Sequence, residues 1–101
     1  YIYKEAFMDY AKLFKVFSDE NRIKVVQNLV DGVCCTCQFQ EKFDISQPTL
    51  TYHLKLIKDS GLATSEKIGT WNKYHINYDV IDDMIQFLES LKKGEGTKCK
   101  C

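Results

Sequence analysis

The sequence predicts a mainly α-helical domain that carries one β-hairpin, and three observations favour this fold class. Apolar residues recur three and four positions apart in the first third of the chain and again near its end, which is the spacing of amphipathic helices. A further helix start is indicated at Ser46, two positions before Pro48. Two short alternating stretches flank Gly69 and predict a hairpin ahead of the last helix.

The first third of the chain predicts two amphipathic helices. The first is expected over residues 3–17, and its stripe consists of Phe7, Tyr10, Leu13, Phe14 and Phe17. Ser18 is the expected N-cap of the second, because a hydroxyl can accept a hydrogen bond from the first turn. Asp31-Gly32 is expected to end that helix, whose apolar positions include Ile23, Val26 and Val30.

A short helix is expected from Cys34 or Cys35 to Phe43, and a longer one follows it. In the longer helix Ser46 is the expected N-cap, and Gly61 after Ser60 is the expected terminator. Its buried side is formed by Leu50, Leu54 and Ile57. The residues about 100° to 200° away from Leu50 are polar, aromatic or basic, and they are Pro48, Thr51, Tyr52 and Lys55.

The last third predicts the hairpin and a final helix. The strands are expected over residues 62–67 and 71–77, joined by Ile68-Gly69-Thr70. The final helix is expected to begin at Asp79, with an apolar face of Val80, Ile81, Met84, Ile85, Phe87, Leu88 and Leu91. Residues 1–92 are therefore expected to form one domain, and residues 93–101 a flexible, cysteine-containing tail.

The order of four helices, a hairpin and a fifth helix is that of a winged helix-turn-helix domain. The third and fourth helices form the helix-turn-helix, and the hairpin forms the wing, in which Trp71 is expected to pack at the base. The alternative is a small helical bundle whose hairpin has no role. A capped helix with a polar outer side next to a basic hairpin favours DNA binding.

Composition limits the classes of protein that the chain can belong to. A domain of 101 residues has a modest core, so a dimer is expected to help its stability. No apolar run is long enough for a membrane span and no signal peptide is recognisable, so we expect a cytoplasmic protein without a membrane partner. The net charge is zero, but residues 46–76 hold four lysines against two acidic residues, whereas residues 77–91 hold four acidic residues and no basic one. This distribution permits a DNA-binding surface and is also compatible with two ordinary solvated surfaces.

Three thiols within four positions, Cys34, Cys35 and Cys37, indicate a soft-metal or redox site. A trivalent arsenic or antimony centre suits three thiolates arranged in a pyramid. On an ideal helix Cys34 and Cys37 share a face, whereas Cys35 and Cys37 differ by about 200°. Binding of one ion by all three therefore requires the first turn to be frayed or to unwind, and this distortion would pass into the attached helix-turn-helix.

Several stretches of the chain resemble the ArsR/SmtB family of metal-responsive repressors over about residues 10–91. The resemblance rests on Phe17-Ser18-Asp19, Asn21-Arg22, the decapeptide SQPTLTYHLK that starts at Ser46, Gly61-Leu62, and Lys73-Tyr74-His75-Ile76. Residues 33–39, VCCTCQF, resemble the arsenic-sensing signature Glu-Leu-Cys-x-Cys-Asp-Leu, with Cys35 and Cys37 at the paired cysteine positions. The resemblance implies a homodimer that pairs through the first and last helices, and a repressor that leaves operator DNA when As(III) or Sb(III) binds.

The chain departs from the family pattern at several positions. Val33, Cys34 and Gln38 replace Glu, Leu and Asp of the signature, Glu20 replaces the usual Pro, and Tyr52 replaces a histidine. Gln40 stands where some arsenic sensors have a third cysteine, so the third ligand is expected to be Cys34, or Cys99 and Cys101 of the tail. The zinc site that other family members build on the last helix is not expected, since that helix has no histidine.

The residues expected to contact double-stranded operator DNA follow from position. Gln47 can form paired hydrogen bonds with adenine, and Thr51 and Tyr52 can contact base edges or a thymine methyl group, while Lys55 can reach a phosphate. The full expected set is Ser46, Gln47, Thr49, Thr51, Tyr52 and Lys55 in the helix and Lys67, Thr70, Asn72 and Lys73 in the wing. His53 and His75 are expected to be packing or hydrogen-bonding residues rather than metal ligands.

Alternatives to an arsenic-responsive repressor use the same cysteines. A thiol redox or persulfide sensor would respond by oxidation, and a cadmium or lead sensor would take a fourth ligand, for which the tail cysteines are available. An enzyme is not expected: Cys34 and Cys37 have the Cys-x-x-Cys spacing, but no strand-helix-strand context supports a thioredoxin-like fold. No organic cofactor is expected.

Overall fold

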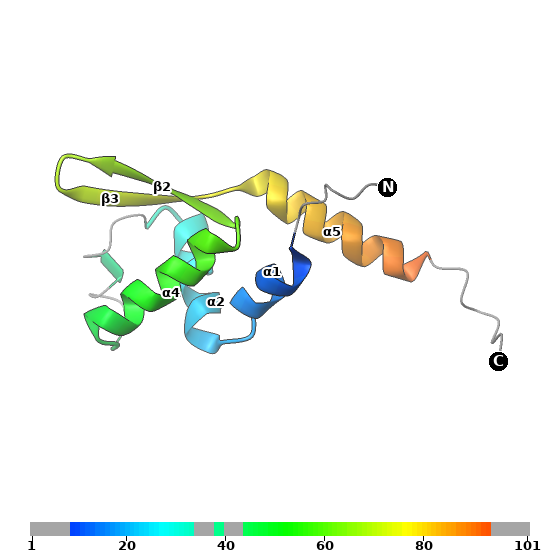
Figure 1. Ribbon diagram of the computed structural model, residues 1–101, viewed down its shortest axis with the longest axis horizontal. Coiled ribbons are helices and arrows are strands. Elements are labelled where there is room, and N and C mark those ends of the chain that lie inside the picture. Colours follow the sequence, from blue (N-terminus) through cyan, green and yellow to red (C-terminus); the bar gives the residue numbers. More distant parts are fainter. Residues whose placement is uncertain (1–8, 34–37, 40–43, 94–101) are drawn as a thin grey trace.

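The computed structural model describes residues 9–33, 38–39 and 44–93. Figure 1 shows helices packed beside a two-stranded hairpin, with a last helix leading away from it. The elements in chain order are α1 (Tyr10–Val16), α2 (Glu20–Val30), α4 (Gln47–Asp59), β2 (Ala63–Ile68), β3 (Trp71–Ile76) and α5 (Tyr78–Lys92). Of the short helix expected before Phe43, only Gln38 and Phe39 are described, and both are helical. Within the described ranges, no helix has the length and apolar character needed to cross a membrane.

The two N-terminal helices are capped by aspartates. Helix α1 begins at Tyr10, because Asp9 is extended and its carboxylate accepts a hydrogen bond from the Lys12 backbone N–H at 3.2 Å. Residues 3–8 of the expected first helix lie outside the described residues. The expected N-cap at Ser18 is wrong: Asp19 caps α2. A carboxylate is a better partner than a hydroxyl for the positive end of a helix. The Ser18 hydroxyl instead donates to the Lys15 carbonyl oxygen at 2.6 Å.

Helix α4 begins and ends where the sequence predicts. The Ser46 hydroxyl accepts from the Thr49 backbone N–H at 3.3 Å and donates to the Thr49 hydroxyl at 2.9 Å. Pro48 occupies the first turn, where its missing N–H costs nothing. Ser60 is the C-cap, and Gly61 follows it with a φ of 90°, a conformation that favours glycine.

The hairpin of β2 and β3, here called the wing, is antiparallel, with pairs that run from Ala63 and Ile76 at its base to Ile68 and Trp71 at its tip. Ile68 was expected in the turn but pairs as a strand residue, leaving a two-residue loop that starts at Gly69. The φ of Gly69 is 62°, as a type II′ turn requires at this position. The expected base packing of Trp71 is wrong, because its pairing beside the turn places it at the tip, where it is 52% exposed.

Helix α5 begins at Tyr78, one residue before the expected start, and Asn77 is its N-cap. Val80 and Met84 are buried, whereas the outer residues of its apolar face, Ile85, Leu88 and Leu91, are exposed. Phe87 stacks on Tyr10 with ring centroids 4.2 Å apart and planes at 16°, so aromatic contacts join α5 to α1.

The hydrophobic core lies among α1, α2, α4 and the base of the wing. Its residues are Leu13, Val16, Val25, Val26, Leu29, Phe39, Leu50, Leu54, Ile57, Leu62, Ala63, Ile76, Val80 and Met84. Every expected inward residue of α4 belongs to this core. The expected mainly helical class with one antiparallel hairpin is thus confirmed, with α4 and the wing in the arrangement of a winged helix-turn-helix domain.

Candidate nucleic-acid interface

The outward side of α4 is a continuous polar and aromatic surface, here called the outer stripe. It is formed by Gln47, Pro48, Thr51, Tyr52 and Lys55, which together line an open surface depression. Tyr52 is 55% exposed, so its ring and hydroxyl are available to a partner. Lys55 lies 3.5 Å from Asp59, but both side chains are more than half exposed, and such a pair contributes little stability. The stripe can therefore present hydrogen-bonding groups and one cation to a ligand.

The opposite side of α4 holds the stripe in place. Leu50, Leu54 and Ile57 are at most 1% exposed and recur at helical spacing. Rotation of α4 about its axis would bring these side chains into water and the outer stripe into the core. The tertiary packing therefore determines which residues of α4 face outward.

A buried arginine, Arg22 of α2, connects three elements. It is 7% exposed, and its Nε donates to the Val16 carbonyl oxygen at 3.2 Å. Its Nη2 donates to the Lys15 carbonyl oxygen at 3.2 Å and to the Ser18 hydroxyl at 3.4 Å. These acceptors lie at the carboxyl end of α1, where the helix dipole favours a cation.

The same guanidinium reaches α4 through His53. Arg22 Nη1 lies 3.2 Å from His53 Nδ1, and His53 is only 5% exposed. Because a guanidinium has only donors, His53 Nδ1 acts as the acceptor and the proton of the neutral ring resides on Nε2. His53 is thus a buried, hydrogen-bonded residue, as expected from the sequence.

Sequence reasoning missed Arg22 as a structural link, although a signal was present. Arg22 precedes Val25, Val26 and Leu29 at the three- and four-residue spacing of the buried side of α2. A cation on the apolar side of a helix indicates a buried polar contact, since an unpaired charge is rarely buried.

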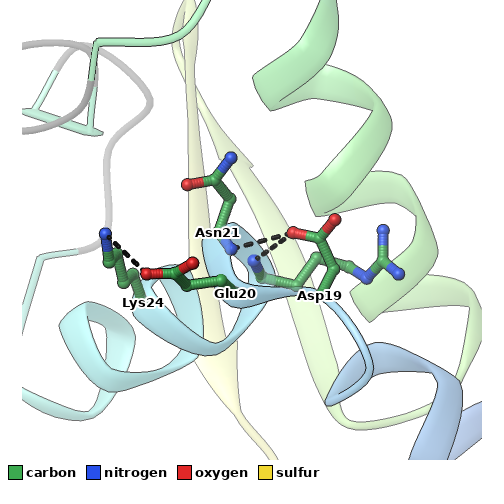
Figure 2. A network of polar contacts seen from close by, with 5 residues as sticks. Asp19, Glu20, Asn21 and Lys24 are labelled. Atoms are coloured by element: carbon green, nitrogen blue, oxygen red, sulfur yellow. Dashed lines mark hydrogen bonds and ion pairs between the residues drawn. The ribbon is translucent and has the colours of Figure 1, made fainter.

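The start of α2 adds charges around this link, as Figure 2 shows. The Asp19 carboxylate accepts from the backbone N–H groups of Asn21 at 2.8 Å and Arg22 at 3.2 Å, and Glu20 pairs with Lys24 at 3.6 Å. The hydrogen bond from the Arg22 backbone N–H holds the pKa of Asp19 below its ordinary value of 3.8. Asp19 thus supplies a negative charge near the buried Arg22 and His53.

Burial lowers the pKa of His53 from its ordinary value of 6.5, because the imidazolium loses solvation there. The Asp19 carboxylate opposes this shift, and the Arg22 charge adds to it. His53 therefore stays neutral at a pH where an exposed histidine would begin to charge.

The wing residues predicted to contact DNA lie along its outer half. Lys67, Thr70 and Asn72 are exposed, and Lys67 is paired with Asn72, while Lys73 is half-buried opposite Glu66. Figure 1 shows the wing tip and the amino-terminal end of α4 at the same end of the molecule.

The predicted cysteine ligands lie outside the described residues: Cys34, Cys35, Cys37, Cys99 and Cys101. In the part of the chain that is described, no three His, Cys, Asp or Glu side chains are grouped so that they could hold a metal ion. Residues on both sides of the first three cysteines reach the core: Phe39 is fully buried, and Val33 packs against the core. The metalloid site accordingly stays a prediction.

Known proteins resemble this chain in sequence and in fold. Residues 19–65 match the family model described as "Bacterial regulatory protein, arsR family". The "Arsenical resistance operon repressor" of Staphylococcus aureus is 32% identical over 96 residues, which cover 95% of this chain and 91% of the relative. The protein of the same name from Bacillus subtilis is 35% identical over 101 residues, covering 94% of each.

Solved structures agree on the fold. The crystal structure of an ArsR family transcriptional regulator has a TM-score of 0.79 at 19% identity, and the match covers 97% of this chain and 98% of the other. This likeness extends over the helices and the wing together. The family match and the sequence relatives show that the chain is a DNA-binding transcriptional repressor rather than an enzyme, and that it belongs to the arsR family of bacterial regulatory proteins.

Proposed function

We propose that the protein is a cytoplasmic, homodimeric repressor that binds double-stranded operator DNA in the absence of inducer and releases it when As(III) or Sb(III) binds Cys34, Cys35 and Cys37. The observation that carries this proposal is the outer stripe of α4, whose helix follows closely after the three cysteines in the chain. The printed names of the two relatives, both arsenical resistance operon repressors, support the choice of inducer.

DNA recognition is assigned to the outer stripe and the wing. Gln47 forms paired hydrogen bonds with an adenine, Thr51 and Tyr52 contact neighbouring base edges, and Lys55 leaves Asp59 for a phosphate. Ser46 and Thr49 lie at the amino-terminal end of α4, where backbone N–H groups favour a phosphate oxygen. Lys67, Thr70, Asn72 and Lys73 are assigned to the phosphates and the minor groove beside this site.

Dimerisation is assigned to α1 and α5. Ile85, Leu88 and Leu91 are between 48% and 64% exposed on one helix, which is an apolar surface that a second copy of the chain would cover. The stacked Tyr10 and Phe87 rings already join the two helices within one protomer. A two-fold dimer would place two copies of α4 in reach of a near-palindromic site.

The inducer is assigned to three thiolates because As(III) and Sb(III) prefer soft sulfur ligands in a pyramid. Cys34 is the third ligand in this proposal, beside Cys35 and Cys37. On a regular helix Cys35 and Cys37 point about 200° apart, so binding distorts the segment that contains them. Phe39 and Ile45, which pack in or against the core between this segment and α4, are positioned to transmit the distortion.

The free energy needed for the switch is within reach of such a site. Moving a population from mostly DNA-bound to mostly free takes about 5 kcal/mol of differential ligand affinity. Three sulfur bonds to a soft ion that form in only one of the two conformations can supply this difference.

The test is a binding titration with a labelled duplex, selected from a random library for binding to the intact protein. Anisotropy is measured at fixed salt, with and without arsenite, in a phosphine reductant that keeps the thiols reduced. We expect tight binding without arsenite and release with it. Substituting serine for Cys34, Cys35 or Cys37 should preserve DNA binding and abolish release. The tail variant Cys99→Ser/Cys101→Ser is the matched control and should be released like the unmodified protein.

Other results would identify another function. Persistent tight binding at saturating arsenite contradicts the metalloid assignment. Release by oxidant or sulfide alone would identify a thiol sensor, and release by cadmium or lead that also requires the tail cysteines would identify a four-ligand sensor. A Cys34→Ser variant that still responds to arsenite would remove Cys34 from the ligand set.

A further inference from the structure

The tip of the wing carries two large apolar side chains that the molecule leaves exposed. Ile68 and Trp71 pair directly across the two strands beside the turn, and they are 45% and 52% exposed. Directly opposed side chains in a hairpin lie on the same face, about 5 Å apart at their Cβ atoms. Ile68 and Trp71 therefore form one continuous apolar surface, here called the apolar tip.

The pleat of the hairpin keeps this surface away from the core. Ala63 and Ile76, at the base, are buried and lie on the other face of the hairpin, because side chains alternate along a strand. The face of the apolar tip continues instead through the pairs Glu66 with Lys73 and Thr64 with His75. Movement of the wing against its own core would thus not cover Trp71.

The charge around the apolar tip favours a polyanion. Lys73 lies on the face of the apolar tip, directly opposite Glu66, whereas Lys67 lies on the other face, opposite Asn72. The Glu66 carboxylate lies 3.5 Å from His75 Nε2, toward the base of the wing. A hairpin with an apolar tip and one lysine on each of its two faces matches the minor groove of duplex DNA, where sugar walls are flanked by two rows of phosphates.

The tip is also placed where DNA would be. The wing tip and the amino-terminal end of α4 project toward the same end of the molecule (Figure 1). When the outer stripe of α4 enters a major groove, a hairpin at this end reaches the neighbouring backbone and minor groove.

We propose that Trp71 and Ile68 pack against the sugar walls of the minor groove next to the major groove bound by α4, with Lys67 and Lys73 on the flanking phosphates. The contact reads the width and deformability of the groove rather than base identity, since the two apolar side chains offer no paired hydrogen bonds to base edges. This inference rests on the proposed DNA-binding function and assigns the wing its part in it.

The chain contains its own probe, because Trp71 is the single tryptophan among its 101 residues. Trp71 emission of the unmodified protein is followed while the selected duplex is added, and quenching by acrylamide is measured at each point. Label anisotropy on the same samples reports binding independently. We expect binding to move the emission to the blue and to reduce quenching, because the ring leaves water.

Two classes of variant separate apolar from ionic contacts. Trp71→Ala should weaken binding about tenfold while the dependence of affinity on salt keeps its slope, since no phosphate contact is lost. Lys67→Ala should lower that slope by about one unit. Ile68→Ala tests the second residue of the apolar tip, and Val30→Ala is its matched control. Val30 is 48% exposed at the end of α2, and its substitution should leave DNA affinity unchanged.

The outcomes distinguish this inference from the function on which it rests. If the duplex binds with unchanged Trp71 emission and quenching, the apolar tip has no DNA contact, while the repressor function stands. A response of Trp71 to anionic vesicles and none to DNA would likewise overturn the inference. Failure of the intact protein to bind any selected duplex would overturn the repressor function itself. A similar unfolding midpoint for Trp71→Ala and the unmodified protein shows that a loss of affinity is local.

Discussion

Helix α4 and the wing, the two elements proposed to contact DNA, are held in different ways. Helix α4 has capping hydrogen bonds at Ser46 and Ser60, three fully packed core residues, and a buried link from His53 to Arg22. In the wing Ala63 and Ile76 are buried and Tyr74 packs, partly buried, against the core, whereas the tip depends on pairing between the strands. A helix that contacts base edges needs a fixed orientation. A hairpin that contacts the minor groove benefits instead if its tip can adjust its position to the width of the groove.

This contrast predicts where substitutions act. A change on the inner side of α4 should lower the free energy of unfolding of the whole domain, since the helix and the core share the same residues. A change at the wing tip should leave that free energy nearly unchanged and act on DNA affinity. The following predictions test this contrast, from the largest expected effect to the smallest.

Leu54→Ala should give the largest loss of stability. Leu54 is 1% exposed in the core, and removing a buried leucine side chain typically costs about 2–5 kcal/mol. Ile68→Ala at the 45% exposed wing tip should change the free energy of unfolding by less than about 0.5 kcal/mol. Urea unfolding followed by circular dichroism measures both, and equal losses would contradict the contrast between helix and wing.

Arg22→Met should lower the free energy of unfolding by about 1–3 kcal/mol, because it leaves buried acceptors on α1 and His53 without their donor. Arg22→Lys is the comparison variant: it keeps the charge, but one ammonium group cannot reproduce the planar set of contacts to Val16, Lys15 and His53. We expect it to recover only part of the loss. Full recovery by lysine would show that charge alone matters at this position.

Ser46→Ala should cost about 1 kcal/mol, since the Thr49 backbone N–H loses its cap. The loss is expected at the end of α4 that is proposed to bind DNA, so DNA affinity should fall together with stability. Ser90→Ala is the matched control, because the exposed Ser90 hydroxyl donates to the Phe87 carbonyl oxygen within α5 and caps no helix start. Thermal unfolding of both variants distinguishes loss of the cap from loss of any serine hydroxyl.

The smallest expected effect is the dependence on pH that His53 gives to the free energy of unfolding. The pKa of His53 is lowered in the folded protein, so the unfolded chain binds more protons below its ordinary value of 6.5. The free energy of unfolding should therefore fall as the pH drops from about 7 toward 5.5, above the range in which Asp19 titrates. His53→Asn should reduce this slope and His75→Asn should retain it. An unchanged slope in His53→Asn would exclude His53 as its source.

Much of the fold followed from patterns that neighbouring residues make. The inner and outer sides of α4, its cap at Ser46, its end at Gly61 and the existence of the hairpin are local consequences of spacing, hydrogen-bonding side chains and glycine. The exposure of Trp71 was not predicted, since it depends on the strand register: Ile68 joins β2 and pairs with Trp71, which places Trp71 beside the two-residue turn.

The start of α2 shows a different limit of sequence reasoning. Ser18 and Asp19 are adjacent and both can cap a helix, so the pattern alone does not choose between them. In the folded protein Asp19 caps α2, while the Ser18 hydroxyl serves the end of α1 and contacts Arg22. The choice depends on where α1 ends and on which acceptors the buried guanidinium needs.

The sequence alone was sufficient to predict the winged helix-turn-helix class from periodicity and helix caps. It was also sufficient to predict, as a hypothesis to test, an inducer that binds the thiols of Cys34, Cys35 and Cys37. These features depend on residues that lie close together in the chain. The link from Arg22 to His53 and the exposed pair Ile68 and Trp71 emerged only from the folded chain. Both depend on contacts between separate elements, and such contacts are set by how the elements pack rather than by the spacing within any one of them.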